Sequence, residues 1–193
     1  EFRQNNSIIA YLYACDNETV DGLEFPSSDW ITECSQGIPI ILDCSSNFLS
    51  RPLPRADSSI ELIFAGVQKN LGGAGVTAVL KRKSTSFSHS HSRIPAVMDY
   101  VVMEKHDSLL NTPPVMNIHL CSLMLEWLLN KFPGGLSEID EFSKRKAKAL
   151  YDCLSTSRAF YCDIDLHFQS RMNVVFHGKE ATQEKELLKR TEA

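Results

Sequence analysis

The sequence predicts an α/β fold, in which a mostly parallel sheet with flanking helices is followed by part of a smaller α+β domain. Three observations predict it. Short, continuously apolar runs typical of buried strands recur through the first 80 residues of the 193-residue chain. Apolar residues at helical spacing replace them from residue 116 onward. A strand-like run then returns at residue 171, before a last helical stretch.

Four strands are expected in the first half. The earliest, at residues 7–15, is rich in β-branched and aromatic residues and stops at a turn-forming Asp-Asn pair. The IPIIL run at residues 38–42 is apolar throughout, which predicts a strand buried on both faces of a sheet. Similar runs occupy residues 62–66 and 75–80. Residues 30–37 could hold a loop or a short helix.

The second half is expected to be largely helical. Residues 116–131 end at a Pro-Gly-Gly sequence, which terminates helices. Further helices are predicted at residues 136–154 and 182–193, with a strand at residues 171–177 between them. Large apolar side chains on the first of these helices are expected in the core, and they are Leu123, Leu125, Trp127 and Leu128.

Composition excludes several classes of function. A formal net charge of −4 gives no general attraction for nucleic acid or anionic membranes. No apolar run approaches the roughly 20 residues of a membrane helix. The six cysteines show no zinc-ligand spacing, and His89 and His91 are interpreted as part of a polar loop, so no metal site is expected. Reduced thiols in a cytoplasmic protein are the preferred interpretation, although an even cysteine count is compatible with disulfides.

Two residues at predicted strand ends could carry chemistry. Asp43 would lie at the carboxyl end of its strand, where open α/β sheets bind ligands, but it could equally cap a turn. Lys69 precedes a glycine-rich turn and could be a phosphate contact or a solvated charge; it is not part of a Walker loop, whose glycines come first. A lysine held among apolar residues is desolvated, however, which favours the neutral, nucleophilic amine.

Together these two residues fit the chemistry of pyridoxal phosphate. An enzyme that uses this cofactor needs a lysine that bonds to it covalently and a carboxylate that keeps its pyridine nitrogen protonated. Lys69 and Asp43 lie on successive predicted strands, 26 residues apart, and would supply those two groups.

Five stretches of the sequence form an ordered set. Two of them contain the candidate residues, at 42–53 (LDCSSNFLSRPL) and 64–80 (FAGVQKNLGGAGVTAVL). The others are residues 17–25 (NETVDGLEF), 108–128 (SLLNTPPVMNIHLCSLMLEWL) and 170–176 (SRMNVVF). Together they resemble the phosphoserine aminotransferases, which are fold-type I, class V pyridoxal-phosphate enzymes. The resemblance spans nearly the whole chain, and five motifs in order are far more specific than any single one.

The resemblance assigns roles to individual residues. Lys69 corresponds to the lysine that bonds to pyridoxal phosphate, and Asp43 to the partner of the pyridine nitrogen, so both are predicted to be catalytic. Thr19 and Gln68 correspond to further contacts with the cofactor.

Asn111 and Thr112 correspond to a pair that reaches into the neighbouring subunit's site and binds the cofactor phosphate. This correspondence implies a homodimer with shared active sites. The same residues could also form the entry of the following helix, since threonine before proline suits a helix N-terminus. Both roles are compatible.

The resemblance implies an enzyme of L-serine biosynthesis. It would transfer an amino group from glutamate to 3-phosphohydroxypyruvate, giving O-phosphoserine and 2-oxoglutarate. One alternative is another class V aminotransferase, of the alanine-glyoxylate or serine-pyruvate type, although those enzymes do not share the NTPP and SRMNVVF stretches. A second alternative is a non-catalytic, truncated subunit that binds a full-length partner.

Relative to the family, the chain looks like an internal fragment. It opens without Met and stops inside a helical pattern. The family's phosphate-binding loop, its ring-stacking tryptophan and its substrate-binding arginine and histidine have no counterpart in the sequence. We therefore expect residues 1–134 to form part of the large cofactor-binding domain and residues 135–193 part of the small C-terminal domain. The isolated chain is expected to be inactive.

Overall fold

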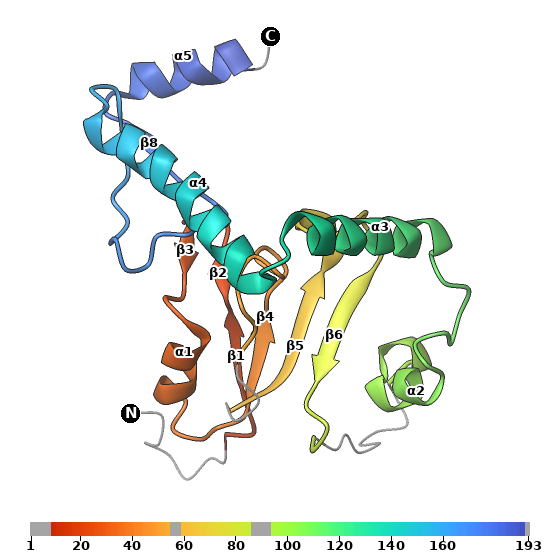
Figure 1. Cartoon of the computed structure of the whole chain (residues 1–193). Coiled ribbons are helices and arrows are strands. Elements are labelled where there is room, and N and C mark those ends of the chain that lie inside the picture. The colour runs from red at the N-terminus through yellow and green to blue at the C-terminus, as the bar shows by residue number, and fades with distance from the viewer. Residues whose placement is uncertain (1–8, 55–58, 86–93, 192–193) are drawn as a thin grey trace.

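The computed structural model describes residues 9–54, 59–85 and 94–191 (Figure 1). A four-stranded sheet forms its centre, with the strand order β1-β4-β5-β6. The first three strands pair in parallel, and β6 runs antiparallel to β5 at the edge. The predicted mostly parallel sheet is therefore confirmed. Its strands are β1 (Leu12–Cys15), β4 (Ile40–Asp43), β5 (Ile60–Gly66) and β6 (Thr77–Lys81).

Five α-helices lie in the described residues, and capping side chains or a glycine turn are found where three of these helices begin. The side chain of Ser27 caps the first helix by accepting a hydrogen bond from the backbone nitrogen of Trp30 at 3.2 Å. Asp99 caps the second in the same way, from the backbone nitrogen of Val101 at 2.8 Å. Gly135, with a φ of 69°, provides the turn into the fourth. The helices are α1 (Ser28–Cys34), α2 (Tyr100–Lys105), α3 (Val115–Lys131), α4 (Leu136–Thr156) and α5 (Ala181–Thr191).

Most predicted elements are confirmed. The helices expected at residues 116–131 and 136–154 correspond to α3 and α4, and the last predicted helix corresponds to α5. Residues 30–37 contain most of the short helix α1. The first strand begins at Leu12 rather than at residue 7, and residues 7 and 8 lie outside the described part of the chain. His89 and His91 also lie outside it.

Short pairings were not predicted. The prediction of a strand at residues 171–177 is wrong for residues 171–176, which do not form a strand. Only residue 177 does, as the first residue of β8. Two small antiparallel pairs and two 3-10 helices complete the described structure. They are β2 (Asn17–Glu18) with β3 (Leu23–Glu24), β7 (Phe160–Tyr161) with β8 (His177–Gly178), η1 (Val67–Lys69) and η2 (Ala96–Met98).

The two faces of the central sheet differ in burial. One face forms the hydrophobic core, where Ile40 and Leu42 are completely enclosed. Helices α1 and α3 contribute Ile31 and Cys121 to this core. On the opposite face, Ile41 of β4 is only partly buried, whereas its partner on β5, Leu62, is buried. The expectation that this strand is buried on both faces is therefore wrong, because the helices that join this core cover one face.

Helix α3 leaves most of its large apolar side chains exposed. Leu123, Leu125 and Trp127 are 48%, 40% and 53% exposed, so their predicted place in the core is wrong. Leu128 does pack against the core, as Cys121 does. These two residues are seven positions apart and share one helix face, and α3 meets the sheet through that face. Within the described residues, none of the helices combines the length and apolar character that a membrane crossing requires.

Candidate active site

Asp43 ends β4, at the carboxyl end of the parallel strands. It lies in register with Cys15 of β1 and Phe64 of β5. Its Oδ1 accepts a hydrogen bond from the backbone nitrogen of Ser45 at 2.9 Å, and its Oδ2 accepts one from the hydroxyl of Tyr13 at 3.1 Å. The turn-capping role expected of this residue is thus confirmed. The side chain stays partly exposed, so a ligand can also reach it.

Lys69 and Gln68 lie directly after β5, in η1. Val67 anchors this turn in the core, whereas the two polar side chains are exposed. The amide of Gln68 folds back over Gly66, where a Cβ atom would lie 2.7 Å from its Oε1. Because Lys69 is exposed, the described residues do not form the desolvated environment that the sequence suggested.

Ser45 connects the ends of β4 and β5. Its backbone nitrogen holds Asp43, and its Oγ accepts a hydrogen bond from the backbone nitrogen of Gly66 at 3.1 Å. Gly66 is the residue that leads into η1 and so into Lys69. One serine therefore ties the carboxylate to the turn that carries the lysine.

Thr19 lies in the turn between β2 and β3, and Glu18 holds this turn in shape. The Glu18 carboxylate accepts hydrogen bonds from the backbone nitrogens of Asp21 at 2.6 Å and Val20 at 3.0 Å. These bonds hold the pKa of Glu18 below its ordinary value, and the charge of Lys69 lowers it further. Glu18, which precedes Thr19, therefore lies within range of the Lys69 charge.

Asn111 and Thr112 lie elsewhere, in the segment between α2 and α3, and both are exposed. Figure 1 shows this segment beyond β6, on the side of the sheet away from β1 and β4. The structure therefore brings Thr19, Asp43 and Lys69 to one end of the sheet but does not bring Asn111 and Thr112 to it within the same chain.

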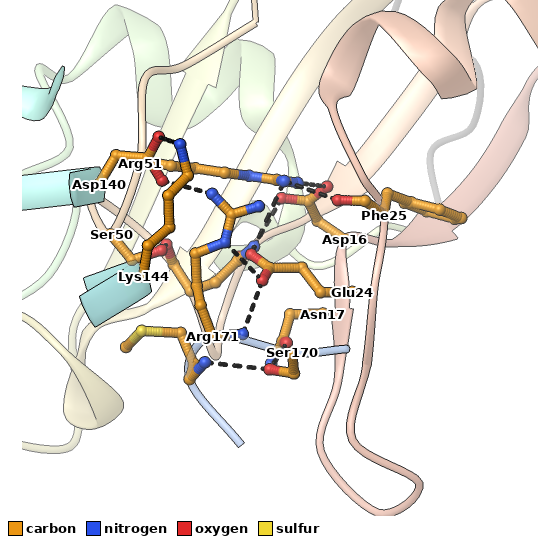
Figure 2. Close-up of polar contacts among 12 residues, drawn as sticks. Asp16, Asn17, Glu24, Phe25, Ser50, Arg51, Asp140, Lys144, Ser170 and Arg171 are labelled. Carbon is orange, nitrogen blue, oxygen red and sulfur yellow. Dashed lines mark hydrogen bonds and ion pairs between the residues drawn. The ribbon is translucent and has the colours of Figure 1, made fainter. Parts of the chain in front are cut away.

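A second polar cluster, which is not expected from the sequence, lies beside the β2–β3 pair. We call it the buried polar junction (Figure 2). Its members come from three of the five ordered stretches, except for Asp16, which directly precedes the first of them. Segments far apart in the sequence therefore meet here. They are Asp16, Asn17, Glu24, Arg51, Ser170 and Arg171.

Arg51 is the central cation of the junction. Its side chain is 7% exposed, donates to Asp16 Oδ1 at 2.5 Å and to the carbonyl of Phe25 at 2.7 Å, and lies 3.7 Å from Glu24 Oε1. Burial lowers the pKa of this guanidinium, but the carboxylates of Asp16 and Glu24 outweigh burial and raise it above its ordinary value. The junction is therefore a set of buried charges that compensate one another.

Arg171 joins the junction to α4. Its Nε donates to Glu24 Oε2 at 2.9 Å, and its backbone nitrogen donates to the same oxygen at 3.0 Å. Its other end forms an ion pair with Asp140, which also binds Lys144 at 2.8 Å. Figure 2 shows the two basic side chains meeting at this carboxylate.

Residues next to Arg171 bind the β2–β3 pair directly. Ser170 Oγ donates to Asn17 Oδ1, and Asn17 Nδ2 donates to Asn173 Oδ1 at 2.8 Å. Gly22, with a φ of 70°, permits this approach, because a Cβ there would lie 2.9 Å from the carbonyl oxygen of Asn173. The polar groups of this segment are thus used in tertiary contacts, which explains why it is not the predicted strand.

The sequence held a weak signal for this junction. Glu24 stands between leucine and phenylalanine, and Arg51 stands four residues after Ser45-Ser46-Asn47, a run of small polar residues that follows an apolar strand. A charge in such a setting requires a partner when it is buried. Glu24 and Arg51 bind residues of the chain itself, so neither matches the pattern of a cofactor contact.

The chemistry available at the sheet end differs from that of the junction. The side chain of Lys69 is accessible and, in its deprotonated form, can attack a carbonyl carbon, and a partly exposed carboxylate on Asp43 can accept a proton or hold a cationic nitrogen. The arrangement therefore suits a ligand that combines a carbonyl group with a basic ring.

Comparison with known proteins decides the family. The model of the aminotransferase class-V family matches residues 4–193, which is nearly the whole chain. This chain belongs to the class-V aminotransferases.

Several class-V aminotransferases are similar to it over most of its length. Phosphoserine aminotransferase of Drosophila melanogaster is 40% identical over 190 residues, which cover 95% of this chain and 50% of that protein. The probable phosphoserine aminotransferase of Dictyostelium discoideum is 41% identical over 177 residues, 91% of this chain and 46% of that protein. The resemblance to phosphoserine aminotransferases is confirmed.

The fold agrees with a solved structure. The crystal structure of phosphoserine aminotransferase with bound pyridoxal phosphate from Trichomonas vaginalis superimposes with a TM-score of 0.79 at 33% identity. The match covers 93% of this chain and 49% of that one. The fold is therefore that of the fold-type I aminotransferases, and the chain spans about half the length of the relatives it matches.

Proposed function

We propose that this chain belongs to a phosphoserine aminotransferase, which transfers an amino group between glutamate and 3-phosphohydroxypyruvate to give O-phosphoserine in L-serine biosynthesis. The observation that carries the proposal is the position of Asp43 and Lys69 at the carboxyl ends of the adjacent strands β4 and β5. Its second support is the 40% identity to a phosphoserine aminotransferase over 95% of the chain.

The residues at this end of the sheet fit pyridoxal phosphate. Lys69 is exposed and makes no ion pair with another described residue, so its amine is available for a covalent bond. Each oxygen of Asp43 accepts one hydrogen bond and retains capacity for another, as a partner of a ring N–H requires. We therefore propose pyridoxal phosphate as the cofactor.

The catalytic roles follow from these groups. When bound, pyridoxal phosphate supplies the electron-withdrawing ring on which transamination depends. Lys69 would hold the cofactor through Nζ and, once released, would move the proton at the substrate's α-carbon. Asp43 would keep the ring nitrogen protonated, and Thr19 and Gln68 would supply further polar contacts.

We further propose a homodimer with shared active sites. In this arrangement Asn111 and Thr112 would bind the cofactor phosphate held mainly by the other subunit. Their exposure, and their distance in the fold from the strand ends that carry Asp43 and Lys69, support a role outside their own chain's site. The exposed apolar residues of α3, the helix that follows them, also suit contact with another polypeptide.

Two finer proposals concern organisation and location. We propose that residues 1–134 belong to the large cofactor-binding domain and residues 135–193 to the small C-terminal domain, which is supported by the Pro-Gly-Gly turn between α3 and α4. We also propose a cytoplasmic location, which is supported by the six cysteines, all of them free thiols.

The cofactor proposal is tested by absorbance spectroscopy of the purified chain with added pyridoxal phosphate. We expect a long-wavelength band in the wild-type chain, its loss in Lys69→Ala, and its retention in Lys105→Ala, which removes an exposed lysine on α2. A wild-type chain without the band, or equal loss in both variants, would contradict the proposal.

The substrate proposal is best tested on the longest protein that the gene produces, because this chain spans about half the length of the relatives it matches. O-phosphoserine and alanine would be added separately to the cofactor-loaded protein. Loss of the long-wavelength band with O-phosphoserine, but not with alanine, supports the proposed substrate. A response to alanine instead would favour the alanine-glyoxylate type of class V aminotransferase.

A further inference from the structure

Tyr13 lies beside Asp43 on the partly buried face of the sheet. It belongs to β1, two residues before the position that pairs with Asp43. Its ring reaches across β4 and stacks on Phe64 of β5, with ring centroids 6.3 Å apart and an interplanar angle of 24°. Its hydroxyl donates to Asp43 Oδ2 at 3.1 Å. The stacking therefore directs the hydroxyl toward the carboxylate.

The Asp43 carboxylate is held at both oxygens. Ser45 binds Oδ1 through its backbone nitrogen, and Tyr13 binds Oδ2. Two donors on opposite oxygens restrict rotation of the carboxylate, which a single donor would allow. We propose that Tyr13 is a positioning residue, which fixes the orientation in which Asp43 meets the ring nitrogen of the cofactor. This inference rests on the proposed function.

A tyrosine suits this role because it donates without adding charge. A lysine or arginine at the same point would compete with a cationic ring for the carboxylate. Partial burial, the hydrogen bond to Asp43 and the negative charge of that carboxylate raise the pKa of the Tyr13 phenol. The phenol therefore stays protonated, and able to donate, throughout the neutral range.

The contact can be tested without the cofactor, by following tyrosinate absorbance during an alkaline titration. We expect Asp43→Asn to lower the pH at which one phenol ionises, because the acceptor charge is lost. The same substitution should have no such effect in a Tyr13→Phe background. An Asp43→Asn titration identical to wild type would overturn the inference.

The positioning role is tested by the affinity for pyridoxal phosphate, measured from the absorbance band. Tyr13→Phe should weaken binding by about threefold to tenfold, the range expected for one hydrogen bond. Tyr11→Phe is the matched control, because Tyr11 lies just before β1, is 55% exposed against 59% for Tyr13, and makes no hydrogen bond to another described residue. It should bind the cofactor as the wild-type chain does.

The outcomes separate this inference from the proposed function. Equal affinity in wild type and Tyr13→Phe would overturn the positioning role, even if the titration showed the contact. Equal weakening in Tyr11→Phe and Tyr13→Phe would overturn it too. A wild-type chain that does not bind the cofactor would contradict the proposed function, and the tyrosinate titration would still decide whether Tyr13 holds Asp43.

Discussion

The two polar regions of this chain are built in opposite ways. In the buried polar junction, the charges of Arg51 and Glu24 are 7% and 1% exposed, and each has a charged partner within the chain. At the carboxyl ends of β4 and β5, Gln68 and Lys69 are exposed, and Asp43 keeps acceptor capacity. Polar groups that are buried and paired hold segments together, whereas groups with spare capacity are available to a ligand.

The buried polar junction, which we call the closed region, supports the carboxyl ends of β4 and β5, which we call the open region. Asn17 of the junction donates to Ser46 Oγ at 2.7 Å, and the Ser46 hydroxyl donates back to the carbonyl of Asn17 at 2.6 Å. Ser46 follows the serine that holds Asp43, and Asn17 begins β2, the short strand that leads into the turn with Thr19. The junction thus fixes the backbone from which the candidate cofactor contacts project.

The largest expected effect tests the closed region. Arg51→Ala should lower the free energy of unfolding by about 3–5 kcal/mol, because it leaves the buried Asp16 carboxylate without its cation and removes one of the two guanidinium groups beside Glu24. Lys69→Ala, in the open region, should change it by less than about 0.5 kcal/mol. Urea unfolding of both variants makes the comparison, and similar losses would remove the distinction between the regions.

A smaller effect compares two cations on one carboxylate. Arg171 and Lys144 both bind Asp140, but Arg171 also holds Glu24, whose side chain is 1% exposed, while Lys144 is 49% exposed. Arg171→Ala should cost about 2–3 kcal/mol, because a buried carboxylate loses a donor. Lys144→Ala should cost less than about 1 kcal/mol. Thermal unfolding at low salt measures both, and equal costs would show that burial does not decide the contribution.

The smallest effect concerns alkaline pH. Tyr151 of α4 donates to the carbonyl of Ser170 at 2.9 Å, and burial raises its pKa to about 12 from an ordinary 10.0. Its contribution to stability is complete below pH 10 and is lost as the pH rises through about 12, because the folded state binds the proton more tightly than the unfolded state does.

Tyr151→Phe should therefore flatten the loss of stability in this pH window, as measured by urea unfolding at several pH values. Tyr11→Phe, which removes an exposed phenol, serves as the control and should keep the wild-type slope. An unchanged slope in Tyr151→Phe would show that this hydroxyl does not couple α4 to the junction.

The sequence predicted the parts of the fold that depend on local pattern. Short apolar runs such as residues 38–42 and 62–66 are typical of strands inside a sheet, because they are too short for an ordinary helix. The end of α3 and the start of α4 follow from the Pro-Gly-Gly turn between them. Asp43 and Lys69 were found because both follow a buried strand, and the structure has them at neighbouring strand ends.

The remainder depends on contacts between distant segments. Arg51 and Arg171 are 120 residues apart, and nothing local indicates that both bind Glu24. Trp127 is apolar and was assigned to the core, yet it is exposed, because α3 turns another face to the sheet. Periodicity locates a helix, but it does not say which face of an apolar helix meets the sheet.

The central claim is that Lys69 is the residue that bonds to pyridoxal phosphate. The most direct measurement is borohydride reduction of the chain mixed with the cofactor, followed by peptide mass spectrometry to find the modified lysine. We expect the label to be concentrated on the peptide that contains Lys69. In Asp43→Asn, which should bind pyridoxal phosphate more weakly, we expect this peptide to lose the label. Label spread evenly over exposed lysines such as Lys105 and Lys148, with no preference for Lys69, would contradict it.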